Sequence, residues 1–599
     1  MDDEFLSYFE RELTFMREMG REFAKKYPKI AGRLQLEPDK CEDPHTERLM
    51  ESFAFLCARV HKRLDDDFPQ ITQSLLNVIY PHYTCPIPSM SVVQFAPLFK
   101  NIPENGYRLE KGTPLFSRAV NGTACRFATA YPVTLWPMEV VSATMGEPRR
   151  LVKDAQQAIC IRLKLHQPLA VANLQGRRLR FFLNGQRQQV FQLYELLLNN
   201  VCHVEWASVG KAVPSVIPLG ADAVSPVGFG EDEALLPCLR QSFPGYRLLL
   251  EYFCFPEKFL FVDVAAPLTG TDDFGPDAEL TIYLDSAARS ALSVGADTFR
   301  LHAAPVINTF QKLAEPIRIE HRKTEYLVIP DLRRMDAAEV LSVDAVTATL
   351  AASPAKSKEY QPLYSIRHHC EEADAPPDSS FWHMQRRPSG RSGDKGTEVY
   401  LSFCDLQAHP VDPVEETVTV RITCSNRDLP GKLPFGDPAG DFETETAAPL
   451  RAISCLVKPT ATLRTSLGGA LQWRLISHLS LNYLSLVEGG EDALKEILKL
   501  YDFEDSPATR QQISGLVSLK VRHVTKRIGQ AFCRGIEVTI DFDEDKFVGS
   551  GVYLFASVLE RFLGQYVSIN SFVQVVARTV QRKEILKKWP PRSGDRVLL

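Results

Sequence analysis

Residues 43–83 read DPHTERLMESFAFLCARVHKRLDDDFPQITQSLLNVIYPHY, and this stretch decides the fold of the N-terminal region. Asp43 can cap a helix, because its carboxylate accepts hydrogen bonds from the free amides of the first turn. Pro44 suits the next position, where a missing N–H does no harm. The apolar residues then recur three or four apart, at Leu49, Phe53, Leu56, Val60 and Leu64. This spacing predicts a helix with one apolar stripe and otherwise charged faces.

The end of the same stretch predicts where the helical region stops. Pro69 disfavours helical geometry at the residue before it, so the first helix should break there. A second, shorter helix is expected to carry Ile71, Leu75 and Val78. Prolines recur over 80–88 and remove backbone donors, which predicts extended chain.

The residues before this stretch carry another apolar pattern. Its members alternate three and four apart, at Leu6, Phe9, Leu13, Met16, Gly20, Phe23 and Tyr27. A repeat of 3.5 residues favours a helix that wraps another helix along its length. The partner is either the helix that follows Asp43, in a hairpin, or a helix of another chain. Two antiparallel helices leave apolar surface exposed unless a third element covers it, so both alternatives stay open.

Length and composition indicate a multidomain globular protein. The chain has 599 residues, of which 45% are hydrophobic and 24% charged, and this length predicts about three or four domains. The net charge of -5 gives no overall positive field for nucleic acid or anionic lipid. Thirteen cysteines without close pairs fit reduced thiols, which predicts a cytoplasmic protein. The N-terminus lacks a secretory signal, and no apolar run reaches the length of a membrane span.

After residue 90 the apolar period changes from helical to two. Strands are expected at 91–95, 125–136, 159–165, 397–403, 417–423, 534–542 and 571–578. Helices are expected at 191–199, in part of 473–486, at 493–501 and at 551–566. Surface loops are expected at 351–355, 373–378 and 386–396.

These elements predict a multidomain α+β chain with four parts. An N-terminal helical segment (1–90) precedes a β-rich domain (91–324) and a β domain with projecting loops (325–450). A C-terminal α+β domain (451–599) follows. The aromatic residues of 226–261 could stack on bases or sugars, but basic residues are not interleaved among them. A packed core or a protein interface is therefore the favoured interpretation of that cluster.

Catalytic and metal-binding motifs are scarce. The chain has no phosphate-binding loop, no zinc-protease HExxH and no nucleophile elbow. The compact candidate for a metal is His368-His369-Cys370-Glu371-Glu372, but adjacent strand residues face opposite ways and paired zinc spacings are missing. A polar loop is favoured there, and an exposed turn is favoured over a cation site at Asp541, Asp543, Glu544 and Asp545. A soluble metal-dependent hydrolase using His368 and His369 is the alternative function.

Several long motifs, in one order along the chain, resemble the TssF family (also called ImpG or VasA) of type VI secretion systems. The motifs are 12–17 (ELTFMR), 43–49 (DPHTERL), 53–60 (FAFLCARV), 80–83 (YPHY), 86–90 (PIPSM), 131–137 (YPVTLWP), 245–253 (GYRLLLEYF), 255–259 (FPEKF), 426–430 (NRDLP) and 477–482 (SHLSLN).

The resemblance implies a structural subunit of the baseplate wedge, similar to the wedge proteins of contractile-phage baseplates, with no catalysis and no cofactor. It implies that two copies join one TssG through a shared N-terminal helical bundle. It further implies contacts with TssK, TssE, neighbouring wedges, a hub protein and the sheath, in a cytoplasmic assembly docked at the inner membrane. With the resemblance, the bundle becomes the favoured partner of the apolar seam. The expected protein-binding residues are Leu6, Phe9, Leu13, Met16, Phe23, Leu49, Phe53, Leu56 and Val60.

Overall fold

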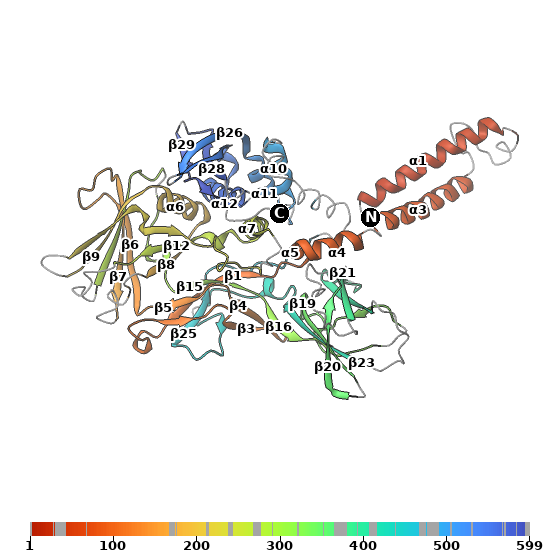
Figure 1. The fold of residues 1–599 in the computed structure, drawn as a ribbon, viewed down its shortest axis with the longest axis horizontal. Helices are drawn as coiled ribbons and strands as arrows, with labels where there is room; N and C mark the ends of the chain where they lie inside the picture. The colour runs from red at the N-terminus through yellow and green to blue at the C-terminus, as the bar shows by residue number, and fades with distance from the viewer. Residues whose placement is uncertain are drawn as a thin grey trace. The chain divides into compact units, whose positions relative to one another are not determined.

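The structure is a computed structural model of the chain (Figure 1). It describes residues 3–27, 29, 44–66, 69–166, 174, 177–210, 215–237, 243–267, 277–289, 292–319, 323–350, 353–363, 380–391, 393–405, 416–437, 439–465, 475, 490–503, 506–528, 531–565, 567, 571–582 and 584–593.

The chain forms two compact units. The first consists of Met1–Leu76 with Ser466–Ser477, and the second of Asn77–Thr465 with His478–Leu599.

The first unit is built on a pair of long antiparallel helices, α1 (Asp3–Lys26) and α3 (Pro44–Asp66), which lie side by side (Figure 1). The next helix, α4 (Pro69–Ile79), begins in this unit. The predicted helix at Pro44 is confirmed, while the predicted break, at residues 67 and 68, lies outside the described residues. Helical backbone at both prolines follows from their place at the first helical position, where their missing N–H has no intrahelical role.

The extended chain predicted after α4 is wrong in part. A short helix, α5 (Pro81–Thr84), follows Tyr80, with proline again at its first position. The Thr84 hydroxyl donates to the side-chain oxygen of Asn77 at 2.7 Å and ties this turn back to the end of α4. The sequence-based prediction treated Pro81 as a residue that excludes helix, whereas proline is well tolerated at the first position of a helical turn.

The second unit contains a closed six-stranded barrel. Its strands are β1 (Met90–Pro97), β15 (Ala303–Ile307), β4 (Thr123–Thr129), β3 (Pro114–Val120), β24 (Phe442–Glu443) and β25 (Leu450–Cys455), in that spatial order. Apolar side chains such as Phe95, Phe127 and Ile453 fill its core. The barrel thus takes strands from three of the four predicted parts of the chain, and the four-part division stays a prediction.

Two antiparallel sheets formed by residues between β4 and β15 follow. One has the order β10 (Val216–Leu219), β9 (Val201–Ser208), β13 (Asp277–Leu284), β7 (Gln157–Leu165) and β6 (Met138–Gly146). The other has the order β11 (Val224–Pro226), β12 (Phe261–Ala265), β8 (Arg178–Leu183) and β14 (Phe299–Arg300). The helices α6 (Arg187–Asn199) and α7 (Pro244–Cys254) belong to the same region. The predicted strand at 159–165 and helix at 191–199 are confirmed.

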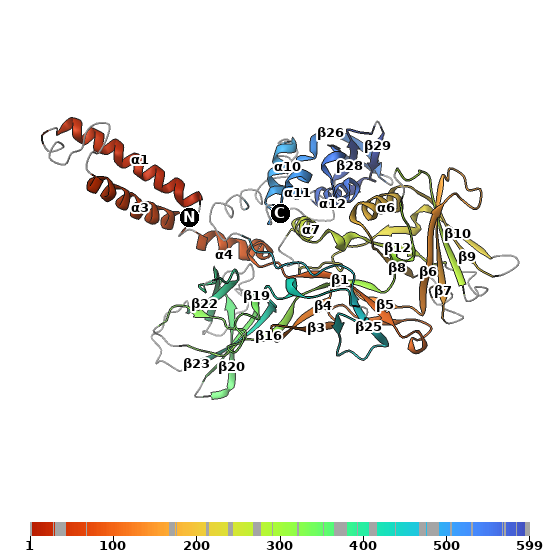
Figure 2. The same ribbon diagram turned by 180° about the vertical axis from the view of Figure 1, so that it is seen from behind.

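A larger sheet, visible from behind in Figure 2, carries the predicted loop-rich part of the chain. Its order is β16 (Phe310–Leu313), β23 (Glu416–Ser425), β19 (Glu339–Leu350), β20 (Ser353–Pro362), β21 (Ser380–Pro388), β22 (Thr397–Asp405) and β18 (Tyr326–Leu327), with β17 (Ile317–Arg318) beside β23. The loops predicted at 351–355 and 386–396 are too long: β20 begins at Ser353 and β21 ends at Pro388, because antiparallel pairing with β19 and β22 continues up to these residues.

The C-terminal part is a mixed sheet with helices, as predicted. The strand order is β26 (Leu516–Ile528), β27 (Ala531–Phe542), β28 (Ser571–Thr579) and β29 (Ile585–Lys588), with β30 (Arg592–Ser593) also paired to β28. The β27–β28 pair is parallel, and α12 (Val552–Gly564) makes the crossover between them. The other helices are α10 (Gly490–Lys499) and α11 (Pro507–Ser514). The helix predicted over 473–486 lies almost wholly outside the described residues.

The remaining elements are short. They are the strand pair β2 (Tyr107–Leu109) and β5 (Val133–Leu135) and the 3-10 helices η2 (Phe99–Asn101), η4 (Ala221–Ala223), η5 (Pro256–Phe259), η6 (Ala296–Thr298), η7 (Pro430–Lys432) and η8 (Glu544–Lys546).

Candidate functional site: an assembly surface and buried ion clusters

Helix α3 buries a face made of small residues. Ala54 and Ala58 are four residues apart, so they share one face of the helix, and both are fully buried. On the paired helix α1, the ring of Phe9 meets the ring of Phe55 edge to face, with centroids 6.4 Å apart. Small side chains at a helix contact let two axes approach closely, so the alanines allow the close packing of α1 and α3.

The predicted apolar stripe of α3 is exposed. The exposed fraction is 73% for Leu49, 54% for Phe53, 56% for Leu56 and 56% for Val60. Their spacing of four, three and four residues places the four side chains on one face. A contiguous exposed apolar patch of this kind marks an interaction site more often than a solvated surface does.

The predicted seam of α1 is divided between two environments. Phe9, Leu13 and Met16 are half-buried, and Phe9 belongs to the contact with α3. Phe23 is 38% exposed, and the side chain of Leu6 lies outside the described residues. The hairpin alternative therefore accounts for the half-buried part of this seam, while Phe23 is exposed and stays a predicted partner contact.

Sequence reasoning missed a second exposed row on α1. Phe15, Met19, Phe23 and Tyr27 are each four residues apart, and the exposed fractions of Phe15 and Met19 are 59% and 49%. The rings of Phe23 and Tyr27 are in contact, with centroids 5.4 Å apart. The sequence does show this row as apolar residues four positions apart, but the prediction assigned Phe23 and Tyr27 to the 3.5-residue seam instead.

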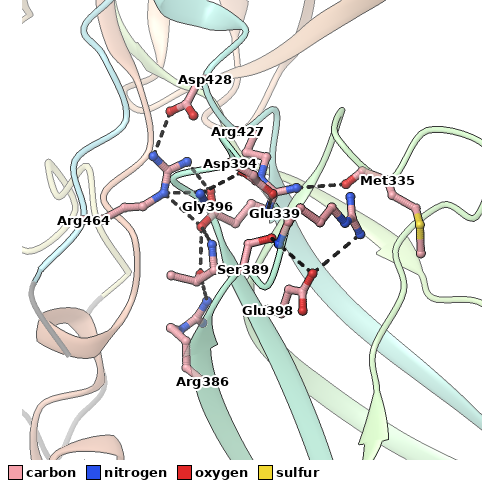
Figure 3. Close-up of polar contacts among 12 residues, drawn as sticks. Met335, Glu339, Arg386, Ser389, Asp394, Gly396, Glu398, Arg427, Asp428 and Arg464 are labelled. Atoms are coloured by element: carbon pink, nitrogen blue, oxygen red, sulfur yellow. Dashed lines mark hydrogen bonds and ion pairs between the residues drawn. The ribbon is translucent and has the colours of Figure 1, made fainter. Parts of the chain in front are cut away.

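A buried ion cluster connects the start of β19 to the start of β22 and to Asp428 and Arg464, which lie outside the strands (Figure 3). Glu339, at the start of β19, accepts hydrogen bonds from Arg464 at 3.1 and 2.6 Å and from the Thr397 amide at 2.8 Å. Arg464 also pairs with Asp428 at 2.8 Å. Burial alone would raise the pKa of Glu339, but the hydrogen bonds from Arg464 and Thr397 outweigh it and hold the pKa below its ordinary value.

A second ion pair in Figure 3 fixes the loop between β21 and β22. Arg427 is buried, has a positive φ of 56°, and pairs with Asp394 at 2.8 Å. It also donates to the carbonyl of Met335 at 3.0 Å. A Cβ built on Gly396 would lie 2.1 Å from the Arg427 Nε, so only glycine leaves room for this guanidinium.

A third buried cluster lies on α7. The Glu251 carboxylate pairs with Lys258, and both side chains are fully buried. Glu251 also accepts hydrogen bonds from the Leu235 and Leu236 amides at 2.9 and 3.0 Å. Burial lowers the pKa of Lys258 from its ordinary value, against the pull of Glu251. The charged residues of the motifs at 255–259 and 426–430, and Glu251 of the motif at 245–253, are thus engaged in internal ion pairs. The buried Arg247 of the same motif has no ion pair among the described residues, and its Nε and Nη1 have no hydrogen-bond partner there.

The aromatic residues of 226–261 form packed core. Tyr246, Tyr252, Phe255, Phe259 and Phe261 are all buried. A buried ring has no free face for a base or a sugar, so the packed-core interpretation is confirmed for these residues.

The metal candidates receive no support from the described part of the chain. Within those residues no group of three or more His, Cys, Asp and Glu side chains is placed to hold an ion. His368-His369-Cys370-Glu371-Glu372 lies outside them. The exposed turn predicted at Asp541, Asp543, Glu544 and Asp545 is found in part. Asp541 lies within β27, Asp543 and Glu544 are half-buried, and Asp545 is exposed. The Asp543 carboxylate accepts from the Asp545 amide at 3.2 Å at the start of a 3-10 helix. None of the described helices is long and apolar enough to cross a membrane.

Comparisons with known proteins agree with the motifs. The family model "Type VI secretion system, TssF" matches residues 1–596. The chain is 36% identical over 625 residues to the type VI secretion system component TssF1 of Pseudomonas aeruginosa (strain PAO1), with all of both chains covered. A chain in the structure of the type VI secretion system TssK-TssF-TssG baseplate subcomplex has a TM-score of 0.73 at 26% identity, covering 92% of this chain and 99% of that one. A chain of the baseplate complex from the type VI secretion system has a TM-score of 0.63 at 25% identity, covering 99% and 100%. The protein belongs to the TssF family of the type VI secretion system.

Proposed function

We propose that this chain is a structural subunit of the baseplate wedge, and that two copies assemble with one TssG through their N-terminal helices. The observation that carries the proposal is the exposed stripe of Leu49, Phe53, Leu56 and Val60 on a helix whose opposite part is buried. Burying such a side chain is worth about 1.5–3 kcal/mol, so four of them supply a substantial part of an assembly energy.

The exposed row of α1 extends the stripe of α3. A helix turns about 100° per residue, so Phe53 and Leu56 lie about 130° around α3 from the buried Ala54 on average. In the same rotational sense, Met19 lies about 80° around α1 from Phe9, which contacts α3. Two antiparallel helices are related by a two-fold axis perpendicular to the plane that contains both helix axes. Residues rotated in the same sense away from the contact face therefore lie on the same side of that plane in both helices. One side of the hairpin therefore offers a continuous apolar surface to further helices of a bundle.

The full proposal includes the other contacts of a wedge. TssK, TssE, neighbouring wedges, a hub protein and the sheath are the proposed partners of the remaining domains, in a cytoplasmic baseplate docked at the inner-membrane face. Support comes from the two similar structures, one of a TssK-TssF-TssG baseplate subcomplex and one of a baseplate complex of the type VI secretion system. Most charged motif residues serve internal ion pairs in the described structure, which favours a scaffold over an enzyme.

Co-expression with TssG tests the proposal. The wild-type chain is expected to co-purify with TssG as a stable complex, and Phe53→Glu combined with Leu56→Glu is expected to abolish that complex. Ser52→Glu combined with Arg59→Gln is the matched control, because it changes the net charge by the same two units at exposed positions of α3 outside the stripe. Circular dichroism should show that all variants keep the strand-rich fold. A Phe53→Glu, Leu56→Glu chain that still binds TssG would show that the stripe is not the interface.

A further inference from the structure

The strand β26 forms one end of the C-terminal sheet and has 13 residues. The Asp543 amide donates to the Gly515 carbonyl at 2.9 Å, which fixes how the two strands alternate. Within β26, residues 518, 520, 522, 524 and 526 therefore turn their backbone groups to β27, and the residues between them turn theirs outward. No described residue forms a backbone hydrogen bond with the outward groups of Val521, His523 or Thr525.

The outward edge is accessible over most of its length. Leu516 and Leu519 are buried at the start of β26, whereas Lys520, Arg522, His523 and Thr525 are exposed. An open, long strand edge is a template for pairing with another chain, and natural proteins usually shorten, cover or distort such edges.

The charge of β26 selects what can pair with it. The ionisable side chains of the strand are all basic: Lys520, Arg522, His523, Lys526 and Arg527. Arg522 pairs with Glu537 across the sheet at 2.8 Å, and its side chain is still 72% exposed. Like charges opposite each other destabilise a strand pair and opposite charges stabilise it. A second copy of β26 is therefore a poor partner, and an acidic strand is a good one.

We propose that β26 binds an extended, acidic segment of another polypeptide as an additional strand of this sheet. The backbone of Val521, His523 and Thr525 supplies the hydrogen bonds, and the basic side chains supply the preference for acidic residues. Phe532 lies on β27, near the end where β26 and β27 are joined, opposite Arg527 of β26, and it is 78% exposed. This ring offers one apolar contact to the added strand. The inference does not rest on the proposed role in a wedge.

A designed peptide tests the inference on the full chain. The probe is a fluorescein-labelled ten-residue peptide of alternating Glu and Val, and the matched control peptide has Lys in place of Glu. Fluorescence anisotropy is expected to show saturable binding of the acidic peptide alone. Thr525→Pro removes an outward N–H, which an edge strand tolerates, and should weaken binding about tenfold or more. Thr525→Ala keeps that N–H and should bind as the wild type does.

Each other outcome contradicts the inference. Equal binding of the acidic peptide to wild type and Thr525→Pro would mean that charge alone attracts it, without strand addition. No binding, or equal binding of both peptides, would also overturn it. If Thr525→Pro lowers the melting temperature, the double variant Lys520→Glu, His523→Glu decides instead. It should bind the acidic peptide more weakly than the wild type does, because acidic side chains replace two of the five basic side chains of β26, whereas Lys153→Glu, at an exposed position outside this sheet, should bind it as the wild type does.

Discussion

The guanidinium of Arg464 contacts both carboxylate oxygens of Glu339, with N–O distances of 3.1 and 2.6 Å, while the Glu339 side chain is completely buried. Removing one partner of such a pair leaves an uncompensated charge in the interior. We expect Arg464→Met to lower the free energy of unfolding of the second compact unit, which contains both residues, by about 3–5 kcal/mol. The measurement is the urea midpoint followed by tryptophan fluorescence. The double variant Glu339→Gln, Arg464→Met should recover part of the loss, and equal stability of Arg464→Met and wild type would contradict the expectation.

His302 predicts a loss of stability in mild acid. Burial lowers its pKa to about 4, and its Nε2 accepts a hydrogen bond from the backbone N–H of Trp136 at 3.1 Å. An unfolded histidine titrates near 6.5, so the unfolded chain binds more protons below that pH and the folded state loses stability as pH falls from about 6.5 towards 4. The change approaches about 1.4 kcal/mol per pH unit. His302→Asn, which tolerates the positive φ of 57° at this position, should show a smaller drop in melting temperature between pH 7 and pH 5.

Gly396 predicts a local steric limit. An added Cβ would lie 2.1 Å from the Arg427 Nε, and that guanidinium is held by Asp394 and the Met335 carbonyl. Gly396→Ala is expected to lower the free energy of unfolding by about 1–3 kcal/mol. Gly390→Ala in the same loop has no atom within 4 Å of its new Cβ and should stay within about 0.5 kcal/mol of wild type. Identical thermal unfolding curves for the two variants would refute the packing argument.

The exposed row of α1 predicts a second way to disrupt assembly. Met19→Glu should weaken co-purification with TssG as Phe53→Glu does, because both residues are placed on the same side of the hairpin. Thr14→Glu is the control, since Thr14 is exposed on the other side of α1. Quantification of TssG retained on the tagged chain distinguishes the variants. Retention by Met19→Glu equal to that by Thr14→Glu would restrict the interface to α3.

Local signals in the sequence predicted the helices and many strands. Pro44 marked a helix start, and the alternation from Ile159 to Leu165 marked a strand, because each signal depends only on neighbours in the chain. The buried face of α3 was not predicted, because Ala54 and Ala58 have little apolar surface and the larger apolar residues at Leu49, Phe53, Leu56 and Val60 defined the predicted stripe. These alanines are buried because they permit a close helix contact, which is a tertiary property.

Pairings between distant segments could not be predicted. Nothing near Glu339 indicates that its partner is Arg464, and nothing near Met90 indicates that β1 pairs with β25. The predicted binding residues of α3 are exposed, and their role in binding stays a prediction. The 3.5-residue seam of α1 did not distinguish the hairpin face from the outer row. Both faces of α1 carry apolar residues at helical spacing, and only the position of α3 tells them apart.

The strand order of the barrel has a consequence for how the protein is made. β1 ends at Pro97, and the strand that flanks it, β25, begins at Leu450. At a synthesis rate of about 5–20 residues per second, β1 leaves the ribosome roughly 20–70 s before its neighbour exists. During that interval the barrel of the nascent polypeptide stays open with apolar side chains exposed, and any truncated product that stops short of residue 450 keeps this open edge permanently. Chaperone capacity during translation, more than the stability of the finished molecule, should therefore limit the yield of this protein in a foreign host.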